Sequence, residues 1–401
     1  MISANTRVGS IDVLRGITIA AMLLVNDPGD ADNVFTTLRH SPWNGCTFAD
    51  FVFPFFLFLV GVTTHLSQSR RDTGNEGDFR RAIFRRAVIL FGLGLFLNAF
   101  PFYENSLVAG PQWMPAFVGH IIARFAHLRI MGVLQRISIC YVVVALITQK
   151  ASVRSVVAMI AVLLIGYWCA MTLLPVPGEI GVGAQYLNDP AHNLSSWLDR
   201  TLLDWTRVSL GWHLYDPALA YDPEGLLSTI PAIATVLLGV LAGRWMQSPR
   251  TLGERLLKLS MAGLIAIAIG AAWGVVFPIN KPLWTSSYVI YTAGTACLSL
   301  GVVGWVVDYK GWRRWTPPFL VFGTNAILAY VGGELLASIL RSTIKFKVDG
   351  HRLSTGMTVV RGFEGLGAEA RVASALWAIV FVVICYALLR PLYKKRIFLK
   401  V

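Results

Sequence analysis

The chain has 401 residues, of which 55% are hydrophobic and only 14% charged, and its formal net charge is +13. Soluble domains usually carry about a quarter charged residues, so this composition excludes an ordinary soluble globular protein. Lys and Arg gather at the ends of long apolar stretches, which favours membrane topology, and not nucleic-acid binding, as the reason for the positive charge. The five cysteines show no metal-ligand spacing, and we expect no metal site.

About ten apolar segments are candidates to cross a lipid bilayer as helices, which need roughly 20 such residues each. We expect them near residues 11–25, 48–66, 87–103, 130–148, 155–174, 226–245, 260–278, 284–306, 318–340 and 372–390. The pattern therefore predicts an all-α polytopic membrane protein that forms one domain over residues 1–401.

Basic residues concentrate in alternate loops and in the C-terminal tail. By the positive-inside rule, this distribution places the N- and C-termini in the cytoplasm. Segments 26–47, 104–129 and 175–225 then lie outside, the last as a folded cap on the membrane. Loop 341–371 is the exception, because it carries six basic residues although it is expected outside.

Charged residues inside apolar spans are expensive and therefore indicate function or a specific ion pair. Asp12 and Arg15 lie three residues apart on one helix face, where they form either a structural pair or a cationic site for a phosphate or carboxylate. Arg136, in the fourth span, needs an anionic or carbonyl partner, and Asp12 or Asp50 are the structural candidates.

Two acidic residues stand just before the sixth span. Asp222 is a candidate N-terminal cap for that helix. Glu224 faces either lipid headgroups or the amine of a substrate.

The loop between the first two spans is the best candidate for chemistry. It gathers Asn26, His40, Trp43, Asn44 and Asp50 at the outer boundary of the membrane. Pro and Gly residues within it exclude a continuous helix. A lone loop histidine is usually a surface residue, but amides, a tryptophan and a carboxylate surround this one. That environment suits a histidine with a fixed tautomer and a tuned proton affinity.

Several ordered motifs resemble heparan-alpha-glucosaminide N-acetyltransferase and its bacterial relatives, and they cover nearly the whole chain. They are Asp12-Val-Leu-Arg-Gly, Val25-Asn26, His40-Ser-Pro-Trp-Asn-Gly, Thr47-Phe-Ala-Asp-Phe-Val-Phe-Pro54, Gly132-Val-Leu-Gln-Arg136, Tyr221-Asp-Pro-Glu-Gly225, Pro278-Ile-Asn-Lys281-Pro-Leu-Trp284-Thr-Ser-Ser-Tyr288, Gly323-Thr-Asn325-Ala-Ile-Leu-Ala-Tyr330-Val-Gly and the basic tail Lys394-Lys-Arg-Ile-Phe.

The resemblance implies an enzyme that takes acetyl-CoA from the cytoplasm and acetylates the amine of a terminal glucosamine on the other side. It implies His40 as the active residue and Asn26 as its partner, in a bacterial inner-membrane protein that forms a homodimer. One position departs from the family pattern: relatives show His where this chain has Gly333, so any role of that histidine is absent or filled elsewhere.

A mechanism follows for these residues. His40 acts as general base, Asp50 or Asp12 orients its imidazole, and amides of Asn26 and Asn44 stabilise the developing oxyanion. The rival mechanism makes His40 a nucleophile that is acetylated in passing. The rival functions are an amino-sugar transporter and an acyltransferase for another cell-envelope acceptor. Residues expected to contact the acceptor are Trp43, Asn44, Asp222 and Glu224, and those expected to contact acetyl-CoA are Asp12, Arg15, Arg136 and Asn325.

Overall fold

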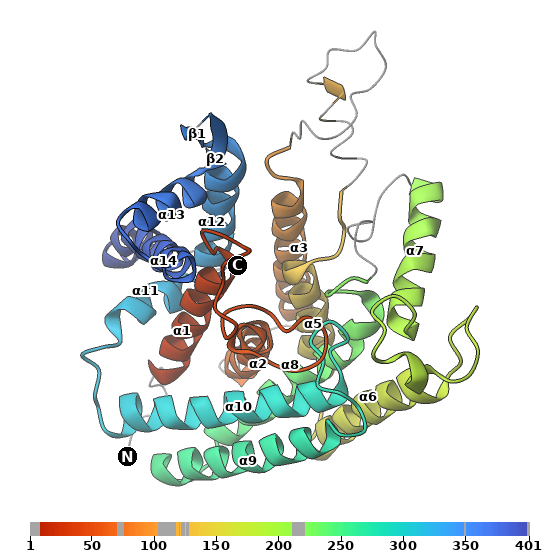
Figure 1. The fold of residues 1–401 in the computed structure, drawn as a ribbon. Coiled ribbons are helices and arrows are strands. Elements are labelled where there is room, and N and C mark those ends of the chain that lie inside the picture. Colours follow the sequence, from red (N-terminus) through yellow and green to blue (C-terminus); the bar gives the residue numbers. More distant parts are fainter. Residues whose placement is uncertain are drawn as a thin grey trace.

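The protein is a bundle of helices (Figure 1), seen in a computed structural model that describes residues 9–69, 76–102, 118–119, 121, 125, 128–210, 221–348 and 350–398. The helices of its first half are α1 Gly9–Asn26, α2 Phe48–Ser69, α3 Glu76–Ala99, α5 Val133–Ile147, α6 Val153–Leu173, η1 Gly183–Tyr186 and α7 Leu194–Leu210. Those of the second half are α8 Leu226–Met246, α9 Leu252–Trp273, α10 Ser286–Gly304, η2 Trp305–Tyr309, α11 Pro317–Thr324, α12 Ala326–Ser338, η3 Ile339–Thr343, α13 Thr355–Gly365 and α14 Ala370–Lys394.

Eight helices within the described ranges are long and apolar enough to span a membrane, so the chain is a multi-pass membrane protein. The bent pair α11 and α12 adds a ninth span if it is counted as one. Helix α5 has 15 residues. At 1.5 Å per residue it is roughly 22 Å long, which is shorter than a bilayer core of about 30 Å. The expectation of about ten spans is therefore supported for eight or nine of them.

The segment expected as one span over 318–340 is broken. Helices α11 and α12 meet at Asn325 and are bent by 89°. Two glycines let α1 lie directly against the end of α11. A Cβ on Gly323 would come 1.9 Å from the carbonyl oxygen of Asp12, and one on Gly16 would come 1.8 Å from that of Phe319. This backbone contact fixes the break beside the first helix.

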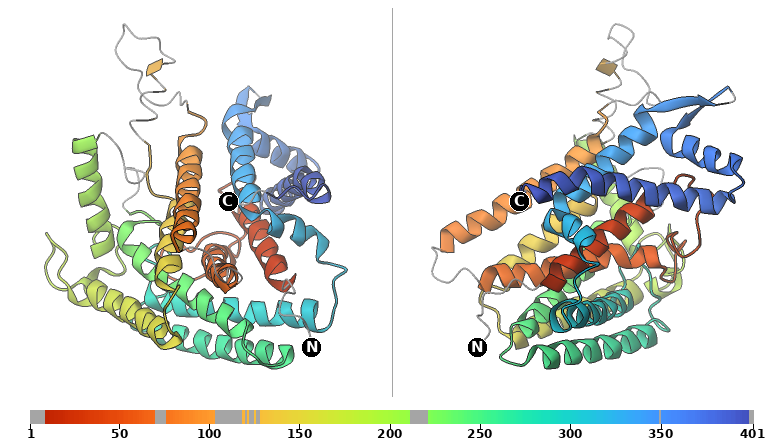
Figure 2. Two further views of the ribbon diagram at one scale, coloured as in Figure 1. Left: turned by 180° about the vertical axis from the view of Figure 1, so that it is seen from behind. Right: turned by 90° about the vertical axis from the view of Figure 1, so that its left-hand side faces the viewer.

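Helices α2 and α8 are the inner spans, because 67% of the residues in the apolar stretch of each are buried. In α9 only 22% of these residues are buried, so this helix faces outward. The right-hand view of Figure 2 shows the start of α1 and the end of α14 toward one end of the bundle. The loop after α1 and the hairpin of β1 Lys345–Val348 and β2 His351–Ser354 lie toward the other end. Asp50, in the first turn of the buried helix α2, therefore lies near the loop end of the bundle.

Candidate functional site

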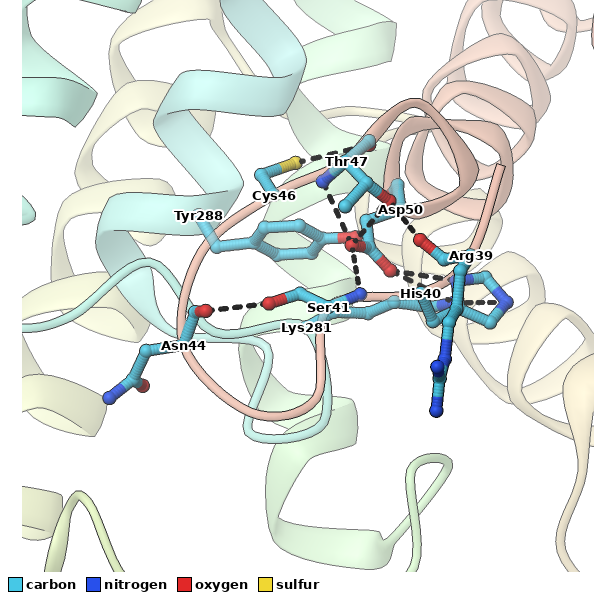
Figure 3. Close-up of polar contacts among 9 residues, drawn as sticks. All are labelled: Arg39, His40, Ser41, Asn44, Cys46, Thr47, Asp50, Lys281 and Tyr288. Atoms are coloured by element: carbon cyan, nitrogen blue, oxygen red, sulfur yellow. Dashed lines mark hydrogen bonds and ion pairs between the residues drawn. The ribbon is translucent and has the colours of Figure 1, made fainter. Parts of the chain in front are cut away.

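His40 and Asp50 form a short hydrogen bond at the start of α2 (Figure 3). The His40 Nδ1 atom lies 2.8 Å from Asp50 Oδ1. The carboxylate is almost completely buried, with 1% of its side chain exposed, whereas the imidazole is 46% exposed. A buried carboxylate against one ring nitrogen selects the tautomer in which Nδ1 carries the proton. The other ring nitrogen, Nε2, then keeps its lone pair.

Local helix geometry holds the Asp50 carboxylate in place. Its Oδ2 atom accepts hydrogen bonds from the backbone N–H of Ser41 and of Thr47, each 3.0 Å long, and from the Thr47 hydroxyl at 3.1 Å. Asp50 is the third residue of α2 and reaches back to Thr47, the residue before the helix, as in a capping box. The Tyr288 hydroxyl donates to the Asp50 carbonyl at 2.6 Å. Asp50 is therefore a fixed point against which His40 is oriented.

Lys281 completes this cluster, although the sequence motif that contains it assigns it no role. Its Nζ lies 3.1 Å from His40 Nδ1, 3.3 Å from His40 Nε2 and 3.6 Å from Asp50 Oδ1. The loop before α10 brings it there, because Asn44 and Asn280 form an antiparallel bridge. Burial lowers the pKa of Lys281, while the charges of Asp50 and Glu224 act in the opposite direction.

Trp43 and Asn44 tie the histidine loop to the segment after α6. The indole N–H of Trp43 donates to the Leu187 carbonyl at 2.9 Å. The Asn44 amide donates to the side-chain oxygen of Asn188 at 2.7 Å, and its own oxygen accepts from Asn280 at 3.1 Å. Both polar groups of Asn44 are thus engaged in holding the loop.

Asn26 is bonded away from His40. Its side-chain amide donates to Glu334 Oε1 on α12 at 3.0 Å. The next residue, Asp27, pairs with Arg341 at 2.7 Å. Glu334 follows Gly333 on α12, so this part of α12 contacts the start of the first loop.

The two acidic residues before α8 share one arginine. Arg129 Nη2 lies 2.6 Å from both Asp222 Oδ1 and Glu224 Oε2. Asp222 does not cap α8, because the residue that precedes this helix is Gly225, with no side-chain cap. The signal for Arg129 in the sequence is that it is one of two arginines in segment 104–129, on the side with few basic residues.

Arg136 contacts neither Asp12 nor Asp50. Its guanidinium donates to the Gly225 carbonyl at 3.1 Å and to the Ser228 hydroxyl at 2.5 Å, and lies 5.1 Å from the centre of the Trp284 ring. The side chain is fully buried, and its Nε and Nη1 atoms have no hydrogen-bond partner among the described residues. It therefore links α5 to the start of α8.

A cavity of about 330 Å³ lies between α1, α2, α3, α5 and the break at the start of α12. Arg15 and Arg86 line it, together with apolar side chains such as Leu134. Arg15 pairs with Asp12 at 2.6 Å and donates to the Gly323 carbonyl at 2.6 Å. A second, more polar cavity of about 230 Å³ also touches Leu134 and extends along α3 and α12 to Glu334.

Asn325 does not line the cavity with Arg15. Its amide donates to the carbonyl of Ile397 in the C-terminal tail at 3.0 Å. The structure thus brings together His40, Asp50 and Lys281, and separately Arg129, Asp222 and Glu224.

Comparisons with known proteins identify the family of the chain. A family model described as "Heparan-alpha-glucosaminide N-acetyltransferase, catalytic" matches residues 7–274. The chain is 31% identical to human heparan-alpha-glucosaminide N-acetyltransferase over 98% of its own length and 60% of the human protein. It is 29% identical to the mouse protein of the same name, over 100% of this chain and 61% of that one. The chain thus spans about three-fifths of these relatives and belongs to the heparan-alpha-glucosaminide N-acetyltransferase family.

Proposed function

We propose that this protein transfers the acetyl group of acetyl-CoA to the amine of a glucosamine-type sugar, with His40 as general base. The observation that carries the proposal is the 2.8 Å contact between His40 Nδ1 and the buried Asp50 carboxylate, in a chain of this family. Acyl transfer to an amine requires a base that removes a proton from the attacking nitrogen, which contributes about 10²–10⁴-fold to the rate.

His40 suits this role because Asp50 holds the proton on Nδ1 and leaves the lone pair on Nε2. The amine nitrogen attacks the thioester carbonyl carbon, its proton passes to Nε2, and the carbon–sulfur bond breaks as the thiolate leaves. The Asp50 charge stabilises the imidazolium that forms. Asp50 itself does not need to take up the proton.

Lys281 supplies the positive charge that this step needs at the carbonyl oxygen. Of the two amides expected to help there, Asn26 is bonded to Glu334 and Asn44 to Asn188. The Lys281 ammonium lies 3.3 Å from His40 Nε2, beside the position of the reacting atoms. A preorganised donor at such a position typically contributes about 3–4 kcal/mol.

The cavity with Arg15 and Arg86 fits the donor. Two guanidinium groups in a chamber that also has apolar walls match a molecule with phosphates at one end and an acyl chain at the other. The polar cavity beyond Leu134 continues toward the loop end of the bundle. We propose that acetyl-CoA enters from the cytoplasmic side and that the sugar arrives from the outside, which in a bacterium is the periplasm.

The test is thiol release by the purified protein in detergent with acetyl-CoA and glucosamine. We expect glucosamine-dependent release that falls by about 10²–10⁴-fold in His40→Ala. His192→Ala is the matched control, because His192 also lies 2.8 Å from a carboxylate, Asp189, but outside this cluster. Equal activity of both variants would refute the role of His40.

A second readout separates direct transfer from a covalent intermediate. Acid-quenched protein incubated with labelled acetyl-CoA alone should carry no label on His40 if the transfer is direct. Stoichiometric label there would show that His40 is the nucleophile. Sugar transport into liposomes without acetyl-CoA, and no thiol release, would favour a transporter.

A further inference from the structure

A third cavity, separate from the histidine cluster, opens at the loop end of the bundle. Its volume is about 290 Å³, just below the range of about 300–1,000 Å³ for small-molecule sites. Asn26 and Asp27 line it from the end of α1, Arg341 from η3, and Trp377 and Phe381 from α14. We call it the outer cavity.

Asp27 is the unusual group in the outer cavity. It is 5% exposed, and only one of its carboxylate oxygens is paired, with Arg341 at 2.7 Å. The other oxygen, Oδ2, has no hydrogen-bond partner among the described residues. Burial, and then the charge of Glu334, raise the pKa of Asp27 to about 7. Buried acceptors without a donor are destabilising, so Oδ2 can gain a hydrogen bond from the donor group of a ligand.

The charges around this cavity favour a cation. Asp27 and Glu334 are two largely buried carboxylates close enough to influence one another, and Arg341 is the cation that acts on both. Arg341 is itself 65% exposed, so solvent weakens its effect. An ammonium group at Asp27 Oδ2 would balance the second negative charge and supply the missing hydrogen-bond donor.

Trp377 gives the same cavity an aromatic wall. Only 6% of this residue is exposed, and it packs against the backbone of Gly29 and Gly356. A Cβ on Gly29 would come 2.9 Å from Trp377 Cβ, so the wall is fixed in place. Aromatic faces attract cations and also pack against apolar ring faces. A carboxylate beside an aromatic wall therefore suits a ring that carries an amine.

We propose that the outer cavity binds the protonated amine of a sugar-sized molecule through Asp27, with Trp377 against its ring, as a holding site for the acceptor. The sugar class rests on the proposed function, whereas the site itself rests on the geometry above. Arg341 lines both the outer cavity and the polar cavity beyond Leu134, so a bound acceptor would stand beside the route inward. The Asn26–Glu334 hydrogen bond lies at the same boundary.

Calorimetric titration of the purified protein with glucosamine and glucose, without acetyl-CoA, tests the site. The two sugars differ only by the amine, and we expect the wild-type protein to bind glucosamine about tenfold tighter or more, as for a buried charge-assisted bond. Asp27→Asn should abolish this preference. Asp32→Asn is the control, because Asp32 is an exposed carboxylate in the same loop.

A comparison of two further variants separates binding from folding. Arg341→Gln breaks the same ion pair but keeps the carboxylate, so it should retain the preference for glucosamine that Asp27→Asn loses. Trp377→Leu should weaken binding of both sugars and leave their ratio intact. Equal loss in Asp27→Asn and Arg341→Gln, or equal affinity of the wild type for both sugars, would overturn the proposal.

Turnover distinguishes failure of the site from failure of the proposed function. In the thiol-release assay, Asp27→Asn should raise the KM for glucosamine about tenfold, with the loss in KM and not in kcat. Thiol release with an unchanged KM would overturn the outer site and keep the enzyme. Asp27-dependent binding of glucosamine without any thiol release would keep the site and overturn the enzyme.

Discussion

Replacing Asp50 with Asn tests the proposed chemistry most directly, because it preserves shape and removes charge. In the native protein, Asp50 Oδ2 accepts three hydrogen bonds, from Ser41 N–H and from the N–H and hydroxyl of Thr47. The Asn carboxamide oxygen must take this position, since all three groups donate. Its NH₂ group then faces His40 Nδ1 and donates to it. The imidazole must therefore move its proton to Nε2 and lose the lone pair that accepts the substrate proton.

The size of both effects follows from these bonds. A hydrogen bond to a charged acceptor contributes about 1.5–3 kcal/mol and a neutral one about 0.5–1.5, so the three retained bonds each lose about 1 kcal/mol. We expect a loss of stability of about 3 kcal/mol and of activity of about 10²–10⁴-fold, the latter through the wrong tautomer.

The assay is glucosamine-dependent thiol release, with unfolding of the detergent-solubilised protein followed in parallel. Asp32→Asn, in the exposed part of the preceding loop, controls for charge alone. A folded Asp50→Asn protein that keeps more than about a tenth of the activity would refute this role of Asp50, because a tautomer switch cannot leave so much base catalysis.

Three further predictions concern other parts of the molecule. Arg86 lines the cavity proposed for the donor, so Arg86→Met should raise the KM for acetyl-CoA about tenfold in steady-state assays. The control variant Arg85→Met, at the exposed neighbouring residue, should leave this KM unchanged. Burial, and then the charge of Asp50, raise the pKa of Cys46 to about 12. Iodoacetamide should therefore label Cys46 about 10³-fold more slowly than a free thiol near pH 8, as followed by peptide mapping. Labelling of Cys46 at the rate of a free thiol would contradict this. The pKa of Asp27 is about 7 in the folded protein, above its ordinary 3.8, so the unfolded chain loses this proton at lower pH and the wild type loses stability as pH rises between these values. The melting temperature of Asp27→Asn should therefore rise relative to that of the wild type across this window. A difference in melting temperature that does not change with pH would refute the burial of Asp27 as its cause.

Part of this structure was predictable because it depends on local sequence. The sixth span was expected over 226–245, and α8 runs over Leu226–Met246. His40 and Asp50 are ten residues apart, on either side of one short loop, so a sequence reading can propose that they act together. Hydropathy does not show the direction in which a helix runs, however, so the apolar segment 318–340 gave no indication of the 89° bend at Asn325.

The remaining parts depend on long-range contacts. Lys281 lies 241 residues from His40 in sequence and reaches it only because the loop before α10 pairs with Asn44. Arg129 meets Asp222 from 93 residues away. No periodicity or spacing in one sequence encodes such pairs, so the cation beside the base and the partner of the acidic pair were both missed.

The break at Asn325 explains how an apolar span forms one wall of a polar chamber. The last carbonyls of a helix have no partner within it, so the end of α11 leaves the Gly323 oxygen free to accept the Arg15 guanidinium at 2.6 Å. Non-helical backbone at membrane depth is tolerated only where protein buries it or a water-filled cavity adjoins it. Residues on both sides of the break line the cavity that holds Arg15 and Arg86, which meets this condition. A straight helix would satisfy the Gly323 carbonyl internally, and Arg15 would lose the contact that holds it at the cavity wall.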